Sequence, residues 1–216
     1  MTHMTKTSNL SYWVNTAIPS PECTPLAGDK IVDIAVIGGG YSGLSTALHL
    51  LESGASTLLI EAGEIGEEAS GRNNGQVIPV LKKEDPEKII KKLGENHGLA
   101  MVSMIRDATN DVFQLVRKYE IDCDAEQSGW LQPAHSNKQM EIVENRVAQW
   151  REHGAEVQLL SRRETTERIG SDFYTGSWCA TTGGHIQPLS YARGLGVAVI
   201  KNGGQIHTQS PALEIT

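Results

Sequence analysis

Short apolar runs and longer amphipathic stretches alternate along the chain. Residues 31–37 (IVDIAVI) are almost continuously apolar and rich in Ile and Val, a pattern typical of a parallel strand that is covered on both faces. Residues 43–53 then predict a helix, because an apolar stripe runs along them at helical spacing. The residues of this stripe are Leu44, Ala47, Leu48 and Leu51.

Two longer segments have the same helical period. Residues 97–119 and 137–153 each predict an amphipathic helix whose apolar face packs in a core. The first face consists of Met101, Ile105, Ala108, Val112, Leu115 and Tyr119. The second consists of Met140, Val143, Val147 and Trp150.

The segment between these two helices has a different pattern. Residues 121–126 alternate apolar and acidic side chains, which predicts a strand with one face in water. Ser128-Gly129 is typical of a turn, and Trp130-Leu131 would begin the return strand. We therefore expect an antiparallel hairpin in a second layer beside the parallel sheet.

One unit recurs at residues 50–61, 150–161 and 199–210: the end of a helix, a Gly, and a short apolar run. Gly suits the left-handed position that ends a helix, and the run suits a strand. Helix–Gly–strand units in series indicate an α/β fold whose sheet is largely parallel.

Composition excludes several classes of protein. With 39% apolar and 21% charged residues among 216, the chain is ordinary for a globular domain and not disordered. A net charge of −7 with scattered basic pairs such as Lys82-Lys83 argues against nucleic-acid binding. No apolar run is long enough to span a bilayer, and the N-terminus lacks the apolar core of a secretory signal.

The reactive side chains are sparse. Cys23, Cys123 and Cys179 are widely spaced, which favours free thiols in a reducing, cytoplasmic compartment. No H-E-x-x-H motif or Cys/His cluster predicts a metal site.

Residues 38–43 (GGGYSG) form a G-x-G-x-x-G motif between the first predicted strand and the first predicted helix. This context is that of a dinucleotide-binding turn. Gly38 permits the tight turn, Gly40 lets the backbone approach a pyrophosphate, and Gly43 lets the helix pack close to the strand. The helix N-terminus then offers free N–H groups to the phosphates.

Glu61 ends the next predicted strand, eighteen residues after Gly43. A carboxylate here can accept hydrogen bonds from the ribose hydroxyls of an adenosine, and it would repel the 2′-phosphate of NADP. The alternative is a surface acid in a loop. The motif by itself does not separate NAD from FAD.

Residues 66–76 (GEEASGRNNGQ) are small, polar and without periodicity. They form either a flexible surface loop or a second backbone-lined cradle. FAD needs such a cradle, because its ribityl chain and isoalloxazine extend well past the pyrophosphate.

Three segments together resemble one family. They are IVDIAVIGGGYSGLSTALHLLESG (31–54), LLIEAGEIGEEASGRNNGQ (58–76) and GGHIQPL (183–189). The chain resembles the FAD-dependent amine and amino-acid oxidases of the D-amino-acid oxidase superfamily, and among them the gamma-glutamylputrescine oxidoreductases. The resemblance implies a Rossmann-type FAD-binding domain with a parallel sheet, joined to part of an antiparallel-sheet substrate domain.

The resemblance also implies the residues that contact FAD. These are Gly38, Gly40, Tyr41, Ser42, Gly43, Glu61, Ala62, Ser70, Gly71, Arg72, Asn73, Gly75, Gln76 and Ala212. The implied reaction oxidises the C–N bond of an amine or amino acid: hydride passes to flavin N5, the imine hydrolyses, and oxygen is the reoxidant. A nucleic-acid or membrane partner is not expected.

No residue is a clear catalytic base. His185 could act as one, but the better interpretation is that it braces the turn before a helix beginning at Pro188, where proline is favoured. Trp130 and Trp178 could wall a substrate pocket, although aromatic residues on strands more often belong to a core.

Members of this family are longer, which implies the following domains. Residues 1–27 are an N-terminal extension, 28–83 and 140–216 bind FAD, 84–139 begin the substrate domain, and the C-terminal half of the fold is missing. We therefore expect the 216-residue chain alone to be inactive and to bind FAD weakly. Two alternatives remain: a non-catalytic nucleotide-binding remnant and an NAD-linked dehydrogenase.

Overall fold

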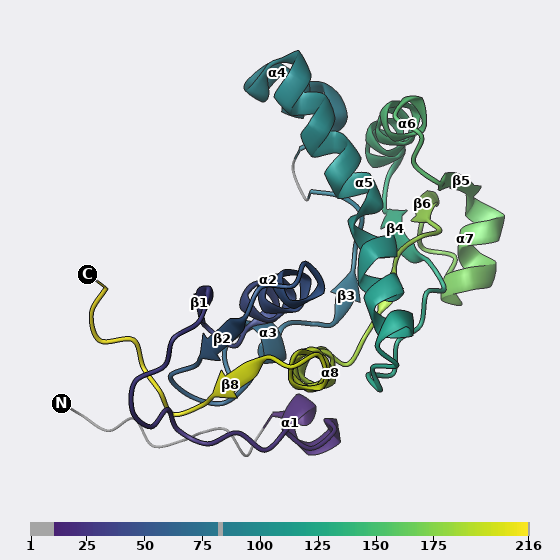
Figure 1. Ribbon diagram of the computed structural model, residues 1–216. Helices are drawn as coiled ribbons and strands as arrows, with labels where there is room; N and C mark the ends of the chain where they lie inside the picture. Colours follow the sequence, from purple (N-terminus) through teal and green to yellow (C-terminus); the bar gives the residue numbers. More distant parts are fainter. Residues whose placement is uncertain (1–10, 82–83, 216) are drawn as a thin grey trace. The chain divides into compact units, whose positions relative to one another are not determined.

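The computed structural model describes residues 11–81 and 84–215 (Figure 1). Residues 1–10 of the predicted N-terminal extension and the basic pair Lys82-Lys83 lie outside the described residues.

Helices and strands alternate along most of the described chain. The helices are α1 (Tyr12–Thr16), α2 (Tyr41–Glu52), α3 (Ala69–Arg72), α4 (Pro86–Leu93), α5 (Glu95–Lys118), α6 (Asn137–Glu152), α7 (Arg162–Ile169) and α8 (Pro188–Lys201). The strands are β1 (Ile34–Ile37), β2 (Thr57–Ile60), β3 (Gln76–Val77), β4 (Trp130–Ala134), β5 (Val157–Ser161), β6 (Gly176–Ala180), β7 (Gly184–His185) and β8 (Gln205–His207).

The chain folds into two compact units, and each of them is discontinuous in sequence. Unit 1 contains residues 1–75, 115–125 and 186–216, and unit 2 contains residues 76–114 and 126–185. These are structural boundaries. The assignment of FAD-binding and substrate domains made from the sequence stays a prediction.

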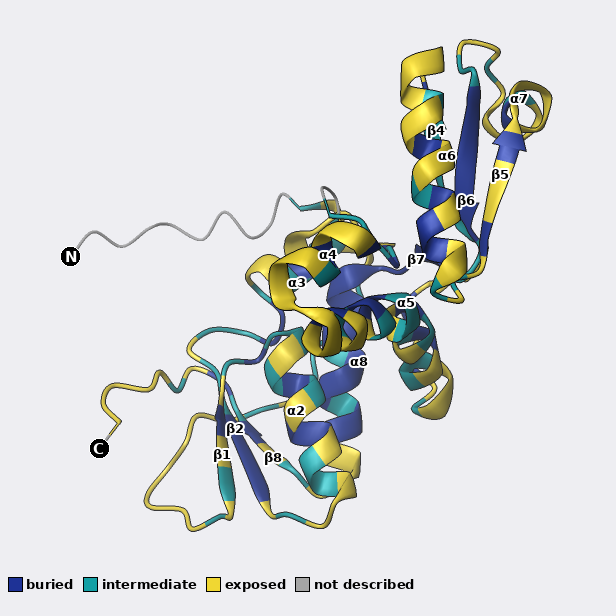
Figure 2. Cartoon of the chain, turned by 90° about the horizontal axis from the view of Figure 1, so that it is seen from above, coloured by how far each residue is buried: buried dark blue, intermediate teal, exposed yellow. Residues whose placement is uncertain are grey.

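Unit 1 is built around a parallel sheet with the strand order β1-β2-β8. Ile34 is in register with Thr57, and Leu58 is in register with Gln205. The helices α2 and α8 lie side by side on one face of this sheet (Figure 2). Leu44, Leu48 and Leu195 are completely buried there. The predicted α/β fold with a parallel sheet is thus confirmed, as is the apolar stripe of α2.

Unit 2 is built around an antiparallel sheet with the strand order β4-β6-β5. Trp150 of α6 and Trp178 of β6 are fully buried in its core, and Ile105 of α5 packs into the same cluster. Two rings, those of Trp130 and Trp178, meet edge to face at 5.7 Å. The core interpretation of Trp178 is therefore confirmed. The buried face predicted for α6 is also confirmed, since Val143 and Val147 share this core.

The recurring glycines end their helices as predicted. Gly54, Gly154 and Gly203 follow α2, α6 and α8 with φ values of +89°, +76° and +88°. The strand after Gly154 was expected to join the parallel sheet, and this was wrong. β5 instead pairs antiparallel with β6 in unit 2, because the local helix–Gly–strand pattern does not determine which strand becomes the partner.

Three further expectations need correction. Residues 121–126 form no strand of a hairpin; Asp124 has a φ of +47°, and only Glu126 makes an isolated antiparallel bridge, with His185. Ile121 is buried against Gly194 of α8. The buried stripe of α5 shares Ile105 with the predicted one, but Val102, Thr109 and Phe113 each lie one position after a predicted residue. β1 was predicted to be covered on both faces, yet Ile37 is 54% exposed.

We expect Trp178→Ala to lower the free energy of unfolding of unit 2 by roughly 3–5 kcal/mol, because it removes the largest buried side chain of β6 and leaves a cavity. Phe173→Ala is the matched control in the same unit. Phe173 is 68% exposed, so its loss should change the free energy by less than about 0.5 kcal/mol. Chemical denaturation monitored by circular dichroism measures both, and equal effects would contradict this core assignment.

Candidate dinucleotide-binding site

The turn between β1 and α2 depends on two glycines. Gly38 has a φ of +106°, a conformation that residues with a side chain rarely adopt. A Cβ built on Gly43 would overlap the carbonyl oxygen of Gly38, so a side chain there would push α2 away from the strand. The roles predicted for these two glycines in the turn and in the close packing fit this geometry.

One backbone donor at the N-terminus of α2, the Tyr41 N–H, is bonded to Ser70 Oγ at 3.1 Å. Gly40 is the N-cap residue and supplies no side-chain hydrogen bond, and the first turn contains no acidic residue. The positive end of the helix dipole and the free N–H groups therefore favour an anion. A Cβ on Gly38 would meet no atom within 4 Å, whereas one on Gly40 would lie 2.9 Å from Ser70 Oγ, so the turn is open at Gly38 and covered by Ser70 at Gly40.

The Glu61 carboxylate lies beside this turn and not in an isolated surface loop. One of its oxygens accepts a hydrogen bond from the Gly39 N–H at 2.6 Å, and the other accepts one from the Gly63 N–H at 2.7 Å. The side chain follows directly after β2, the neighbour of β1 in the sheet. Two backbone donors thus fix a carboxylate next to the glycine turn.

The segment predicted as a loop or cradle at 66–76 is ordered around α3. The Gly66 N–H donates to the carbonyl oxygen of Gly39 at 3.0 Å, and Ser70 Oγ accepts a hydrogen bond from the Tyr41 N–H at 3.1 Å. A Cβ on Gly71 would overlap the carbonyl oxygen of Gly66. The segment is therefore packed against the glycine turn and is not a free surface loop.

The last part of the cradle is shaped by Asn73 and Gly75. Asn73 Oδ1 accepts a hydrogen bond from the Gly75 N–H at 2.9 Å. Gly75 has a φ of +72°, and a Cβ there would overlap the carbonyl oxygen of Ile186. Gln76 begins unit 2, where it pairs with His185 in the short β3–β7 ladder.

The other residues predicted to contact FAD are not packed against the glycine turn by the contacts described above. Ser42, Ala62 and Ala212 are exposed, the last in the segment after β8. Arg72 lines a cavity of about 330 Å³ together with Gly71, Leu189 and Arg193. Among the predicted residues, unit 1 therefore brings together the turn glycines, Tyr41, Glu61, Ser70, Gly71, Asn73 and Gly75.

His185 and the cysteines show no feature typical of catalytic residues. His185 is exposed, and its Nε2 lies 3.7 Å from a carboxylate oxygen of Glu126. Burial raises the pKa of the Cys123 thiol to about 12, so it is a poor nucleophile at neutral pH. The three cysteines are free, and no group of metal-ligating side chains occurs within residues 11–81 and 84–215.

Gln187 is a structural residue that no sequence pattern singled out. Its Oε1 caps α8 by accepting the Ser190 N–H at 2.7 Å, and its Nε2 donates to the carbonyl oxygen of Trp13 at 2.8 Å. The one available signal was its position before Pro188, the first residue of α8.

The parallel sheet, the side-chain-free turn and the fixed carboxylate define a Rossmann-type dinucleotide-binding protein. Comparison with known proteins gives the family. Residues 33–216 match the DAO family, described as FAD dependent oxidoreductase. The chain belongs to this family.

Two curated bacterial relatives illustrate the match. Gamma-glutamylputrescine oxidoreductase of Escherichia coli is 36% identical over 184 residues, which cover 85% of this chain and 43% of the relative. A probable oxidoreductase, OrdL, of Haemophilus influenzae is 30% identical over 207 residues, covering 95% and 48%. The chain spans about half the length of the curated relatives it matches.

Solved structures share the fold. Glycine oxidase of Geobacillus kaustophilus has a TM-score of 0.72 at 18% identity. The match covers 86% of this chain and 48% of the oxidase chain. L-amino acid deaminase of Proteus myxofaciens has a TM-score of 0.74 at 21% identity, covering 90% and 41%. In the described part of the chain, no helix is long and apolar enough to cross a bilayer.

We expect Gly43→Ala to lower the free energy of unfolding of unit 1 by about 1–3 kcal/mol, as overpacking does. Alanine is the better helix former, but its Cβ would strike the backbone carbonyl of Gly38. Gly63→Ala is the control, since the nearest atom there is the flexible carboxylate of Glu67. Denaturant titration of both variants tests this. A Gly43→Ala chain with the wild-type free energy of unfolding would show that α2 can move away from Gly38 at no cost in stability.

Proposed function

We propose that this chain supplies the FAD-binding part of an oxidoreductase that oxidises the C–N bond of an amine or amino acid. The observation that carries the proposal is the Glu61 carboxylate fixed by Gly39 and Gly63 beside the side-chain-free turn. A carboxylate in this place suits the ribose of an adenosine, and the turn suits a pyrophosphate. Membership in a family of FAD-dependent enzymes supports FAD over NAD.

The residues present fit the cofactor. Glu61 would hold the adenosine ribose, and the N-terminus of α2 with the Ser70 hydroxyl would hold the pyrophosphate. The backbone of residues 71–76 would line the ribityl chain and flavin, with Ala212 beside the adenosine part. Bound FAD supplies the hydride-accepting chemistry.

The substrate class rests on relatives. Gamma-glutamylputrescine oxidoreductase and glycine oxidase are named for a substituted amine and an amino acid. We extend this class to the protein, with molecular oxygen as the electron acceptor and the cytoplasm as the location. The described residues contribute no assigned catalytic base, and a neutral amine substrate would need none.

Glu61→Ala should weaken FAD binding by roughly tenfold to a hundredfold, because a charged acceptor of ribose hydrogen bonds is lost. FMN lacks the adenosine part and would make no contact with Glu61. The FMN affinity of the Glu61→Ala chain should therefore stay within about twofold of the wild-type value. Glu68→Ala is the control: the Glu68 side chain is 86% exposed and lies 3.9 Å from Arg72. Flavin fluorescence titration measures all three chains. Equal FAD affinity of the Glu61→Ala and Glu68→Ala chains would remove Glu61 from the site.

Activity can be assigned by peroxide release with gamma-glutamylputrescine and a panel of other amines and amino acids. We expect no turnover by the 216-residue chain alone, because its relatives are about twice its length. A form extended by the C-terminal half of the Escherichia coli relative should turn over an amine. Turnover by the short chain alone would contradict this. A chain that binds FAD in neither form would instead favour a remnant or an NAD-linked enzyme.

A further inference from the structure

Tyr41 connects three segments of unit 1. It is the first residue of α2, and its backbone N–H donates to Ser70 Oγ of α3 at 3.1 Å. Its phenol donates to the carbonyl oxygen of Pro188, the first residue of α8, at 2.9 Å. The same phenol accepts a hydrogen bond from Asn73 Nδ2 at 3.3 Å. One side chain therefore ties the glycine turn, the cradle and α8 together.

The side-chain amide of Asn73 is used within the protein. Its Nδ2 donates to the carbonyl oxygen of Ser70 at 2.8 Å and to that of Ala69 at 3.3 Å, in addition to the Tyr41 phenol. Its Oδ1 accepts the Gly75 N–H, which closes an Asx-type turn. Although Asn73 is exposed, these bonds connect its amide to the backbone of residues 69–75, and both N–H groups of the amide are used within the protein.

The phenol is held in a fixed and protonated state. The Tyr41 ring meets the Tyr191 ring edge to face, with centroids 5.2 Å apart. Burial raises the pKa of Tyr41 to about 12, so the hydroxyl keeps its proton and remains a donor at any pH used for assay. The hydroxyl can therefore donate to the Pro188 carbonyl oxygen, 2.9 Å away, throughout that pH range.

We propose that Tyr41 and Asn73 are positioning residues, which hold the cradle at residues 69–75 in register with the pyrophosphate-binding turn. Their effect on FAD passes through the backbone that they fix and not through side-chain contact with the cofactor. This inference rests on the proposed function. It changes the role that the family resemblance gave to these two residues, from ligands of FAD to supports of its binding surface.

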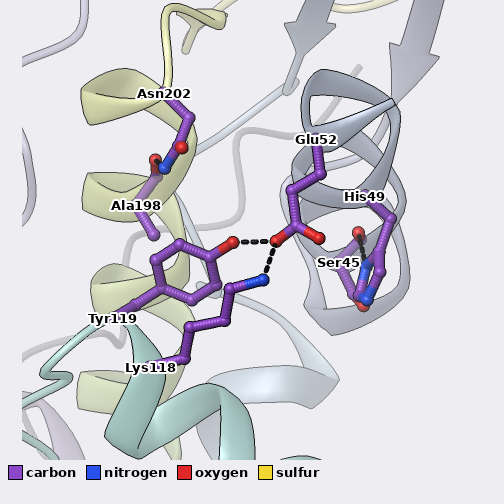
Figure 3. Close-up of polar contacts among 7 residues, drawn as sticks. All are labelled: Ser45, His49, Glu52, Lys118, Tyr119, Ala198 and Asn202. Atoms are coloured by element: carbon purple, nitrogen blue, oxygen red, sulfur yellow. Dashed lines mark hydrogen bonds and ion pairs between the residues drawn. The ribbon is translucent and has the colours of Figure 1, made fainter. Parts of the chain in front are cut away.

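The test compares two tyrosines of the same unit. Tyr41→Phe removes only the hydroxyl that joins the cradle to α8. Tyr119→Phe is the matched control, because the Tyr119 phenol also donates a hydrogen bond, to Glu52 of α2, beside Lys118 (Figure 3). Affinities for FAD and for AMP are measured by titration of the purified full chain, with the melting temperature of each variant.

Tyr41→Phe should weaken FAD binding by about tenfold, the factor carried by one or two hydrogen bonds, and should leave AMP binding as in the wild type. AMP would engage Glu61 and, through its phosphate, the turn, but it lacks the ribityl chain and flavin that would lie along the backbone after Ser70. Tyr119→Phe should change neither affinity. Asn73→Asp is a second variant that keeps the acceptor for Gly75 and loses the donors, and it should reproduce the Tyr41→Phe result. The double variant should be no weaker than about the worse single variant, as expected for one coupled network.

The outcomes separate the two claims. If the wild-type and Tyr41→Phe chains bind FAD equally well, the positioning role is overturned and the proposed function stands. Loss of AMP and FAD binding in parallel, together with a lower melting temperature, would also overturn it, because that is the signature of general destabilisation. A wild-type chain that binds neither ligand would overturn the proposed function and this inference with it.

Discussion

The distance between α2 and β1 is set by the missing side chain at Gly43. Because a Cβ there would overlap the carbonyl oxygen of Gly38, the helix can begin directly behind the strand. The pairing of β1 with β2, with Ile37 in register with Ile60, brings Gly39 within hydrogen-bonding distance of Glu61. The glycine turn and the fixed carboxylate of the proposed site thus depend on two close approaches, of α2 to β1 and of β2 to β1.

A second set of close approaches builds the wall of the site from a distant part of the chain. A Cβ on Gly66 would strike the side chain of Ala192, and one on Gly75 would strike the backbone at Ile186. Both partners lie in or just before α8, which follows the whole of unit 2 in sequence. To form the cradle, residues 66–75 must meet residues near α8 that are more than 100 positions later in sequence, and this closure costs chain entropy. The pairing of β2 with β8 has the same requirement. The short β3–β7 ladder, which pairs Gln76 with His185, closes the base of that loop within unit 2.

Local signals predicted the first half of the site well. The apolar run, the glycine motif, the stripe of α2 and the acid after β2 are all encoded within residues 31–61, and each depends on neighbours in sequence. Partners distant in sequence were harder to predict. The strand at 157–161 carries the same helix–Gly–strand signal as β2, yet it pairs with β6. The alternation at 121–126 predicted a strand, but the burial of Ile121 comes from contact with α8 and not from a sheet.

The electrostatics of the turn explain why glycines matter so much in an acidic protein. With a net charge of −7, the chain repels a diphosphate at long range. Attraction at the site comes from the backbone N–H groups and the dipole of α2, which act only at short range. The Glu61 carboxylate adds a negative charge beside the turn, and the N–H groups of Gly39 and Gly63 stabilise that charge by donating to its two oxygens. The turn would therefore attract an anion only where the anion contacts its backbone directly. In the proposed site such contact depends on Gly38, where a Cβ would meet no atom within 4 Å, and on Gly40, where a Cβ would lie 2.9 Å from Ser70 Oγ. The proposed binding chemistry therefore depends on residues that lack side chains.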